Sequence, residues 1–310
     1  MSTKTSIQWC DATWNPVRGC SRVSEGCRNC YAEGIAARFS NPGAPFHLFA
    51  DRKRSGSKWT GRVELIPAKL EEPLHWREPR RIFVNSMSDL FHENLPISDI
   101  LRVFETMAAA KQHTFQILTK RPARMRYCLS YPDDRLVCES AEHHRLLCTM
   151  PLPNVWMGVS VEDQKTADER IPLLLRTPAV VRFVSYEPAL GPVDFTRWLS
   201  PCTYYCDHDE WGGGHRPSSG LDQVIVGGES GNSARPFDIT WARNVIRQCK
   251  HAGCACFVKQ LGKHPYPGRL GNGRMPDLAL RDGHGGEMTE WPEDLQVREF
   301  PGSAVARGTA

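Results

Sequence analysis

The chain has 310 residues, of which 40% are hydrophobic and 24% are charged, and its formal net charge is +4 at pH 7. This composition is typical of a globular protein with a large core, and no apolar run is long enough to span a bilayer. The polar first residues lack the apolar centre of a secretion signal, so we expect a cytoplasmic protein without a membrane partner. The mild positive charge permits a nucleic-acid partner but does not require one.

Three cysteines close together form the most specific pattern in the chain. Cys20, Cys27 and Cys30 have the spacing C-x6-C-x2-C, and thiolates are the ligands that iron–sulfur clusters and zinc prefer. Three thiolates on a four-iron cluster leave one iron open to a small molecule. With Cys10 as a fourth thiol the site would instead be a closed structural zinc site, and both interpretations stay open. The composition of 31–39 predicts a helix directly after the loop.

A basic stretch at 40–62 follows this helix. It is rich in Gly, Pro and Ser, and its basic residues accompany Trp59. Such a segment is suited to a phosphate backbone and a stacked base, but it is also typical of a solvated loop. The basic residues are Arg52, Lys53, Arg54, Lys58 and Arg62, and more follow at Arg77, Arg80 and Arg81.

Short runs rich in Val, Ile and Phe then alternate with segments of helical length. This alternation predicts an α/β fold, a partial or full TIM-like β/α barrel of parallel strands. We expect the barrel to occupy residues 1–265, with insertions at about 40–62 and 200–220, and an irregular extension at 266–310. The expected strands are 6–9, 82–84, 115–118, 155–159, 181–184, 224–226 and 256–258, and the expected helices are 98–111 with Ser98 as N-cap, 163–176, and 238–251 with Asp238 as N-cap.

Polar side chains directly follow each of the last six expected strands. Because the carboxyl ends of parallel strands meet at one edge of a barrel, we expect them to lie together where substrate sites are found. Lys120 and Arg121 are also suited to binding a phosphate. Turn-forming residues and ion pairs, such as Lys259 with Glu229 or Glu187, remain an alternative explanation. The positions are 85–89, 119–121, 160–163, 185–188, 227–230 and 259–260.

Other cysteines raise the question of a second metal. Their spacing suits either zinc or a surface insertion, and the sequence does not decide between them. One group is Cys202, Cys206, His208 and His215, and another is Cys138, His143, His144 and Cys148. Four further cysteines have apolar neighbours and are expected to be small buried residues: Cys128, Cys249, Cys254 and Cys256.

Six further motifs accompany the cysteine loop. They are Thr13-Trp14-Asn15-Pro16, Val84-Asn85-Ser86-Met87-Ser88-Asp89-Leu90-Phe91-His92, Leu118-Thr119-Lys120-Arg121-Pro122, Ser185-Tyr186-Glu187-Pro188, Gly227-Gly228-Glu229-Ser230-Gly231 and Lys259-Gln260-Leu261-Gly262. Together they resemble a phage-encoded three-cysteine family of radical-SAM-like proteins, within the radical S-adenosylmethionine (SAM) superfamily. The resemblance covers roughly residues 6–265, and the cysteine spacing is longer than in the common radical-SAM loop.

The resemblance implies a [4Fe-4S] cluster on Cys20, Cys27 and Cys30, with SAM at the open iron. Radical SAM chemistry needs an electron donor such as flavodoxin or ferredoxin, and it yields a 5′-deoxyadenosyl radical that abstracts hydrogen from an unreactive carbon. The candidate cofactor-binding residues are Gly227, Gly228, Glu229, Ser230, Asn85 and Ser160. The candidate catalytic residues are Glu187, Lys120, Lys259 and Asp89.

The resemblance to a phage family and the basic loops together suggest a nucleic acid or a modified nucleotide as substrate. The hypothesis is isomerisation of a thymidine bearing an amino-acid adduct in phage DNA, which would help the phage to evade host restriction and would place the protein in the host cytoplasm. Two alternatives stay open. One is a DNA repair enzyme of the photoproduct-lyase kind, and the other is a zinc-stabilised nucleic-acid-binding protein without catalysis.

Overall fold

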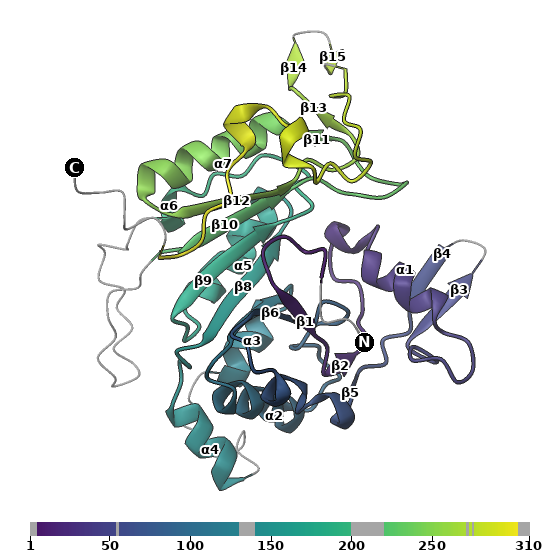
Figure 1. Ribbon diagram of the computed structural model, residues 1–310, viewed down its shortest axis with the longest axis vertical. Coiled ribbons are helices and arrows are strands. Elements are labelled where there is room, and N and C mark those ends of the chain that lie inside the picture. Colours follow the sequence, from purple (N-terminus) through teal and green to yellow (C-terminus); the bar gives the residue numbers. More distant parts are fainter. Residues whose placement is uncertain are drawn as a thin grey trace. The chain divides into compact units, whose positions relative to one another are not determined.

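The computed structural model of the chain describes residues 5–53, 56–129, 140–199, 220–270, 273–274 and 276–302 (Figure 1). Contacts within the chain divide it into two compact units. The first unit comprises Met1–Val159 and Thr177–Val180, and the second comprises Ser160–Arg176 and Val181–Ala310.

The first unit is built on parallel strands whose side chains are buried. Ile82 and Val84 have no exposed surface, and neither do Phe115 and Ile117 on the next strand. Branched and aromatic side chains at adjacent positions favour strands that are covered on both faces. The strands are β1 (Ala12–Trp14), β6 (Arg81–Val84), β7 (Thr114–Thr119) and β8 (Val155–Val161), and the helices are α2 (Ile97–Ala109), α3 (Pro122–Leu129) and α4 (Ala141–Cys148).

Short elements surround the cysteine loop in the first unit. A hairpin within the basic stretch lies beside the helix that follows Cys30 (Figure 1). This helix, α1, was predicted at 31–39 and is confirmed, whereas the hairpin was not predicted. The elements are β2 (Val17–Arg18), η1 (Glu25–Cys27), α1 (Tyr31–Arg38), β3 (Ala50–Lys53), β4 (Gly56–Trp59), β5 (Glu64–Leu65), η2 (Pro67–Lys69) and η3 (Glu72–His75).

The second unit repeats the pattern of parallel strands and helices. Its longest helix lies along two of its strands (Figure 1). The helices are α5 (Gln164–Leu175), α6 (Thr196–Leu199) and α7 (Ile239–Ala252), and the parallel strands are β9 (Val181–Tyr186), β10 (Gln223–Gly227) and β12 (Ala255–Gln260). Smaller elements are β11 (Phe237–Asp238), β13 (Pro265–Tyr266), β14 (Arg269–Leu270), β15 (Gly273–Arg274), η5 (Met288–Glu290) and η6 (Glu293–Leu295).

The strand order of the main sheet is β1-β6-β7-β8-β9-β10-β12. The strands therefore follow the order of the chain, as in a TIM-like β/α barrel, with seven strands instead of eight. The predicted fold class, an α/β protein with a partial TIM-like barrel of parallel strands, is confirmed. All six strands that were expected after residue 81 are present.

Two local predictions were wrong. Residues 6–9 form a turn, and the first strand begins at Ala12, because Asp11 accepts a hydrogen bond from the backbone of Arg81 and aligns the chain with β6. Helix α2 begins at Ile97 with Pro96 as its N-cap, because the fixed φ angle of proline suits the start of a helix. The N-cap Asp238 is confirmed, since its side chain accepts a hydrogen bond from Thr240 N.

Within the described part of the chain, no helix combines the length and the apolar character that crossing a membrane would need.

Candidate metal centre and strand-end residues

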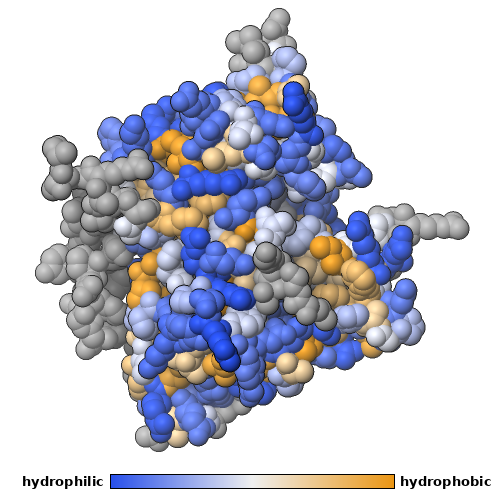
Figure 2. Space-filling model, in the orientation of Figure 1, coloured by the Kyte–Doolittle hydropathy of each residue, from blue (hydrophilic) through white to orange (hydrophobic). Residues whose placement is uncertain are grey.

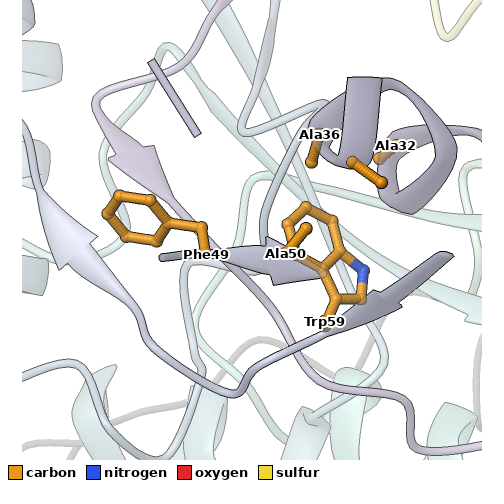
Figure 3. Packing of buried hydrophobic residues seen from close by; sticks show 6 residues of the cluster. Ala32, Ala36, Phe49, Ala50 and Trp59 are labelled. Carbon is orange, nitrogen blue, oxygen red and sulfur yellow. The ribbon is translucent and has the colours of Figure 1, made fainter. Parts of the chain in front are cut away.

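The cysteine loop rests on a small hydrophobic core. Phe49, Ala50 and Trp59 of the hairpin pack against α1, where Ala32 and Ala36 face them (Figure 3). The partly buried side chains of Cys20 and Cys30 pack against the same cluster. Small residues at these positions of α1 let the hairpin approach closely, so this packing fixes the ends of the cysteine loop.

A buried carboxylate ties the loop to this core. Glu33 is 1% exposed, and both of its oxygens accept hydrogen bonds from Nε of Arg22 at 3.1 Å. The backbone N–H of Trp59 donates to the same carboxylate at 2.8 Å. Glu33 therefore joins the cysteine loop, α1 and β4, and a buried charge with this many donors is well compensated.

Arg121 makes a second connection, between the loop and the ends of β6 and β7. Its side chain is 4% exposed and donates to Asp89 at 3.0 Å and to both oxygens of Glu93 at 2.9 Å. It also donates to the carbonyl oxygen of Ser21 at 3.1 Å and to its hydroxyl at 2.8 Å. This environment disfavours the suggested phosphate contact of Arg121, because the side chain is buried and Nε, Nη1 and Nη2 each already donate to a protein acceptor.

The Ser21 hydroxyl also lies 2.8 Å from Nε2 of His92. Nδ1 of His92 accepts a hydrogen bond from the backbone of Asn94, which assigns the ring proton to Nε2. Burial lowers the pKa of His92 below its usual value, and the charge of Arg121 adds to this effect. The oxygen of Ser21 thus accepts from two donors, so its own hydrogen is available for a further acceptor.

Asp89 follows β6 and is 5% exposed. One of its oxygens accepts hydrogen bonds from Thr119 Oγ1 and Phe91 N, and the other accepts from Arg121 and from the backbone N–H of Lys120. The four bonds place Asp89 in the framework of the site. Its catalytic role stays a prediction, as does that of Lys120, whose positive charge acts on Cys30.

Asn85 has an unusual backbone and an unsatisfied amide. Its φ angle is +62°, in the left-handed region that few residues other than glycine adopt, and it is 3% exposed. Its Oδ1 accepts from Val17 N at 3.3 Å, whereas its Nδ2 has no hydrogen-bond partner among the described residues. A buried donor without a partner costs free energy, and strain of this kind is concentrated at functional sites. Asn85 therefore remains a good candidate for ligand binding.

The three cysteines of the loop influence one another electrostatically in every pairing. Burial, with a smaller contribution from Asp89, raises the pKa of Cys20 to about 12, while the charge of Arg121 opposes the shift. Burial also raises the pKa of Cys30, and the first-turn amides of α1 partly offset this. Among the described residues, no three His, Cys, Asp or Glu side chains are already arranged as a metal site.

Cys10 lies at the opposite end of the strands from Cys20. The residue after Cys10 bonds to Arg81 at the start of β6, whereas Gly19 pairs with Ser88 beyond the end of β6. Cys10 itself is buried, and its thiol lies 3.7 Å from the carbonyl oxygen of Ile7. This placement disfavours a closed zinc site with Cys10 as fourth ligand. The donor set of the loop, three thiols, fits a four-iron cluster with one open iron.

The strand-end residues of the second unit form ion pairs. Nζ of Lys259 lies 2.6 Å from Glu187, and both side chains are less than one-fifth exposed. Glu229 accepts from the backbone and the guanidinium of Arg235 at 2.8–2.9 Å. The alternative prediction of a Lys259–Glu187 pair is therefore confirmed, whereas the partner found for Glu229 is Arg235.

The two glycines of the Gly227-Gly228 run are packed against protein. A Cβ atom on Gly228 would lie 2.4 Å from the carbonyl oxygen of Leu261, and its N–H donates to the Gln260 carbonyl at 3.0 Å. Close packing of the chain thus explains the glycine at 228. Ser160 is 3% exposed, and its carbonyl accepts from Arg170, which also bonds to Glu162. The cofactor-binding roles of Gly227, Gly228, Glu229, Ser230 and Ser160 stay predictions.

The predictions for the other cysteines have mixed outcomes. Cys128, Cys249, Cys254 and Cys256 are buried, as expected. The group of Cys202, Cys206, His208 and His215 lies outside the described residues, as does Cys138. His143 lies 3.7 Å from Glu105, and Cys148 is exposed at the end of α4.

Sequence reasoning missed the roles of Ser21, Glu33, His92 and Glu93 at the cysteine loop. Most of their partners lie far away in the sequence, and the motifs at 84–92 and 118–122 did not show which side chains pair. The available signal was an acidic residue, Glu33, among small apolar residues in the first turn of the expected helix, because a buried Glu is rarely found without a partner.

Comparisons with known proteins give a family. A model of the family described as "Protein of unknown function (DUF5131)" matches residues 4–292. No curated protein matches. Among solved structures, a cysteine-to-serine mutant of spore photoproduct lyase is similar with a TM-score of 0.41 and 13% sequence identity, over 96% of this chain and 75% of that chain. The family match covers most of the chain, which therefore belongs to the DUF5131 family.

Proposed function

We propose that this protein is a radical SAM enzyme whose [4Fe-4S] cluster is held by Cys20, Cys27 and Cys30. The observation that carries the proposal is the placement of three thiols on one loop at the carboxyl ends of the parallel strands, with Cys10 at the other end. Three thiol ligands suit a cluster that must keep one iron open, whereas a structural zinc site needs four ligands.

When bound, the cluster supplies the electron that cleaves SAM and gives a 5′-deoxyadenosyl radical. The chain itself excludes water on one side, because Cys20 and Cys30 pack against the hydrophobic core of α1 and the hairpin. The unpaired Nδ2 of Asn85 supplies a buried donor for a polar group of SAM. In the second unit, Glu229 and Ser230 are the proposed contacts of SAM, and Glu229 would exchange a bond to Arg235 for one to the ligand.

The proposed acid–base residues are Glu187 and Lys259. They form an ion pair at 2.6 Å, and a substrate that displaced one partner would expose the other, Glu187 as a proton acceptor or Lys259 as a proton donor. Lys120 and Asp89 are the corresponding candidates in the first unit. A flavodoxin or ferredoxin is the proposed electron donor.

The surface around α1 supports a nucleic acid as substrate. Tyr31 and Ile35 of α1 and its C-cap residue Phe39 recur every four residues, and the two aromatic side chains are more than half exposed. Arg38 and Arg52 line a cavity of about 170 Å³ between α1 and the hairpin. Figure 2 shows hydrophobic and hydrophilic side chains next to one another in the region of α1. Exposed rings stack on bases and arginines bind phosphates, so this surface suits a single-stranded or unpaired segment.

We further propose that the substrate is a thymidine with an amino-acid adduct in phage DNA. The 5′-deoxyadenosyl radical would take a hydrogen atom from an adduct carbon, the adduct radical would rearrange, and 5′-deoxyadenosine would return the hydrogen atom, so the reaction would be an isomerisation without net oxidation. Such a modified base would protect phage DNA from host restriction, and the enzyme would work in the host cytoplasm. A comparison of nucleosides from DNA incubated anaerobically with protein and SAM tests this, and an unchanged nucleoside profile argues against it.

The radical chemistry is tested by adding SAM to the anaerobic, dithionite-reduced protein and measuring 5′-deoxyadenosine. We expect its formation by the wild type and by a Cys148→Ala variant, since Cys148 lies outside the loop at the end of α4. A Cys27→Ala variant should form none, because a loop with two thiols no longer holds the cluster. Equal product from the Cys27→Ala variant and the wild type would contradict the proposal.

A further inference from the structure

Arg121 connects two segments that are 100 residues apart in the sequence. Its Nη2 atom donates to both oxygens of Ser21, the residue after Cys20, at 3.1 and 2.8 Å. The other nitrogens of the guanidinium bond to acidic residues that follow β6. These bonds connect the segment between β7 and α3 directly to the cysteine loop.

The acidic partners fix the guanidinium from two sides. Glu93 accepts from Nε through both oxygens at 2.9 Å, and Asp89 accepts from Nη1 at 3.0 Å. Asp89 is itself held by Thr119 at 2.7 Å and by Phe91 N at 3.0 Å. Because the guanidinium is planar, a position set by two carboxylates also sets the direction in which Nη2 points. The guanidinium group of Arg121 therefore directs Nη2 towards Ser21 in a single orientation.

Ser21 directly follows Cys20 in the chain, so the bonds that hold Ser21 also restrict the orientation of Cys20. The hydroxyl of Ser21 and its carbonyl, which belongs to the Ser21–Arg22 peptide unit, are both held, so the residue next to Cys20 cannot change its backbone conformation without breaking bonds to Arg121. The guanidinium is also near enough for its charge to act on the Cys20 sulfur. The loop is also held by the ion pair of the half-exposed Arg22 with the buried Glu33.

We propose that Arg121 is the positioning residue of the metal-binding loop: it holds Cys20 in the orientation in which the three thiols bind one metal centre. This inference rests on the proposal that Cys20, Cys27 and Cys30 are the metal ligands. It assigns to Arg121 a geometric role that lysine cannot replace, because one ammonium group cannot contact Ser21 and both carboxylates in the same directions.

The test compares Arg121→Lys and Arg121→Met with Arg124→Lys. Arg124 lies on α3, the helix that begins directly after Arg121, and donates to the carbonyl oxygen of Leu95 at 2.7 Å, so it controls for the loss of one arginine bond to a carbonyl. Two readouts apply: hydrogen–deuterium exchange of residues 19–30 in the metal-free protein, and titration with Co²⁺ followed by the thiolate-to-cobalt absorbance.

We expect both Arg121 variants to exchange at 19–30 at least about tenfold faster than the wild type and to bind Co²⁺ at least about tenfold more weakly, which is about 1.4 kcal/mol. Arg124→Lys should match the wild type in both readouts. Wild-type exchange or wild-type Co²⁺ affinity in Arg121→Lys overturns the inference. Arg121→Lys keeps the charge between Asp89 and Glu93, so it remains informative if Arg121→Met does not fold.

The result of the Arg121 test can be distinguished from the result of a test of the radical SAM proposal. A wild type that binds Co²⁺ but assembles no iron–sulfur cluster disproves the radical SAM proposal, while the loss of Co²⁺ affinity in Arg121→Lys still supports the positioning role. A wild type that binds no Co²⁺ at these thiols overturns the inference itself.

Discussion

At the scale of single residues, His113 links stability to pH. It is 1% exposed, its Nε2 lies 3.0 Å from the Pro73 carbonyl oxygen, and its Nδ1 has no hydrogen-bond partner among the described residues. Burial, with a contribution from the charge of Arg80, lowers the pKa of His113 below 6.5. The unfolded chain therefore binds the proton more readily, and the free energy of unfolding falls as the pH drops below about 6.5.

Urea unfolding at about pH 8 and about pH 5.5 measures this effect. The wild type should lose stability over the interval, and His113→Gln should lose less, because its side chain carries no titrating group. His251→Gln serves as the control, since His251 is exposed on α7. An equal loss in the wild type and in His113→Gln would show that His113 is not the cause.

Glu33 gives a second prediction about a single residue. Glu33→Gln keeps the length of the side chain but leaves Arg22 without its buried countercharge, and we expect a loss of about 1–3 kcal/mol in the free energy of unfolding. The matched control is Glu64→Gln, because the carboxylate of Glu64 also pairs with an arginine but is 45% exposed. Its change should stay within about 0.5 kcal/mol. Chemical denaturation of both variants measures the free energy of unfolding. Equal losses of stability in Glu33→Gln and Glu64→Gln would contradict a special role of Glu33.

At the scale of secondary-structure elements, we expect alanine substitutions of two glycines to change stability in opposite directions. Gly228→Ala places a Cβ atom 2.4 Å from the Leu261 carbonyl oxygen, so the end of β10 must move and we expect a loss of about 1–3 kcal/mol or more. Gly34 lies within α1, and a Cβ atom there meets nothing within 4 Å. Gly34→Ala should stabilise the protein by about 0.5–1 kcal/mol, because alanine favours helices. Thermal melts of the two variants test both signs, and a stabilised Gly228→Ala would contradict the packing described here.

The exposed face of α1 makes a further prediction. If nucleic acid binds there, Phe39→Ala removes a stacking platform and should weaken binding of single-stranded DNA by about 1–3 kcal/mol. Leu74→Ala is the control, since Leu74 is also exposed but lies on η3. Fluorescence anisotropy with a labelled oligonucleotide at fixed salt measures the change. Unaltered affinity in Phe39→Ala would remove α1 from the binding surface.

At the scale of the whole molecule, most of the sheet could be predicted from sequence. Strands β7 and β10 contain runs such as Phe115–Leu118 and Val224–Val226, whose branched and aromatic side chains are typical of buried parallel strands. Strand β1 was missed because its three residues include no such run. It is recognisable only from its pairing with β6.

The cysteine site could be predicted only in part. The thiols are local in sequence, so their spacing identified them, whereas the contact of Arg121 with Ser21 depends on how distant segments pack. For the same reason the sequence named Gly228 as a cofactor-binding candidate but could not show that its backbone packs against the Leu261 carbonyl oxygen. The sequence patterns therefore identified the candidate site residues of this region, but they did not predict which residues each of them contacts.

The most direct test of the central claim is metal and sulfide analysis of the anaerobically purified protein. The proposal predicts a brown protein with about four iron and four sulfide per chain, lost in Cys20→Ala, Cys27→Ala and Cys30→Ala and retained in Cys10→Ala. A colourless wild type that contains zinc and loses it in Cys10→Ala would contradict the three-thiol cluster and establish a closed structural site.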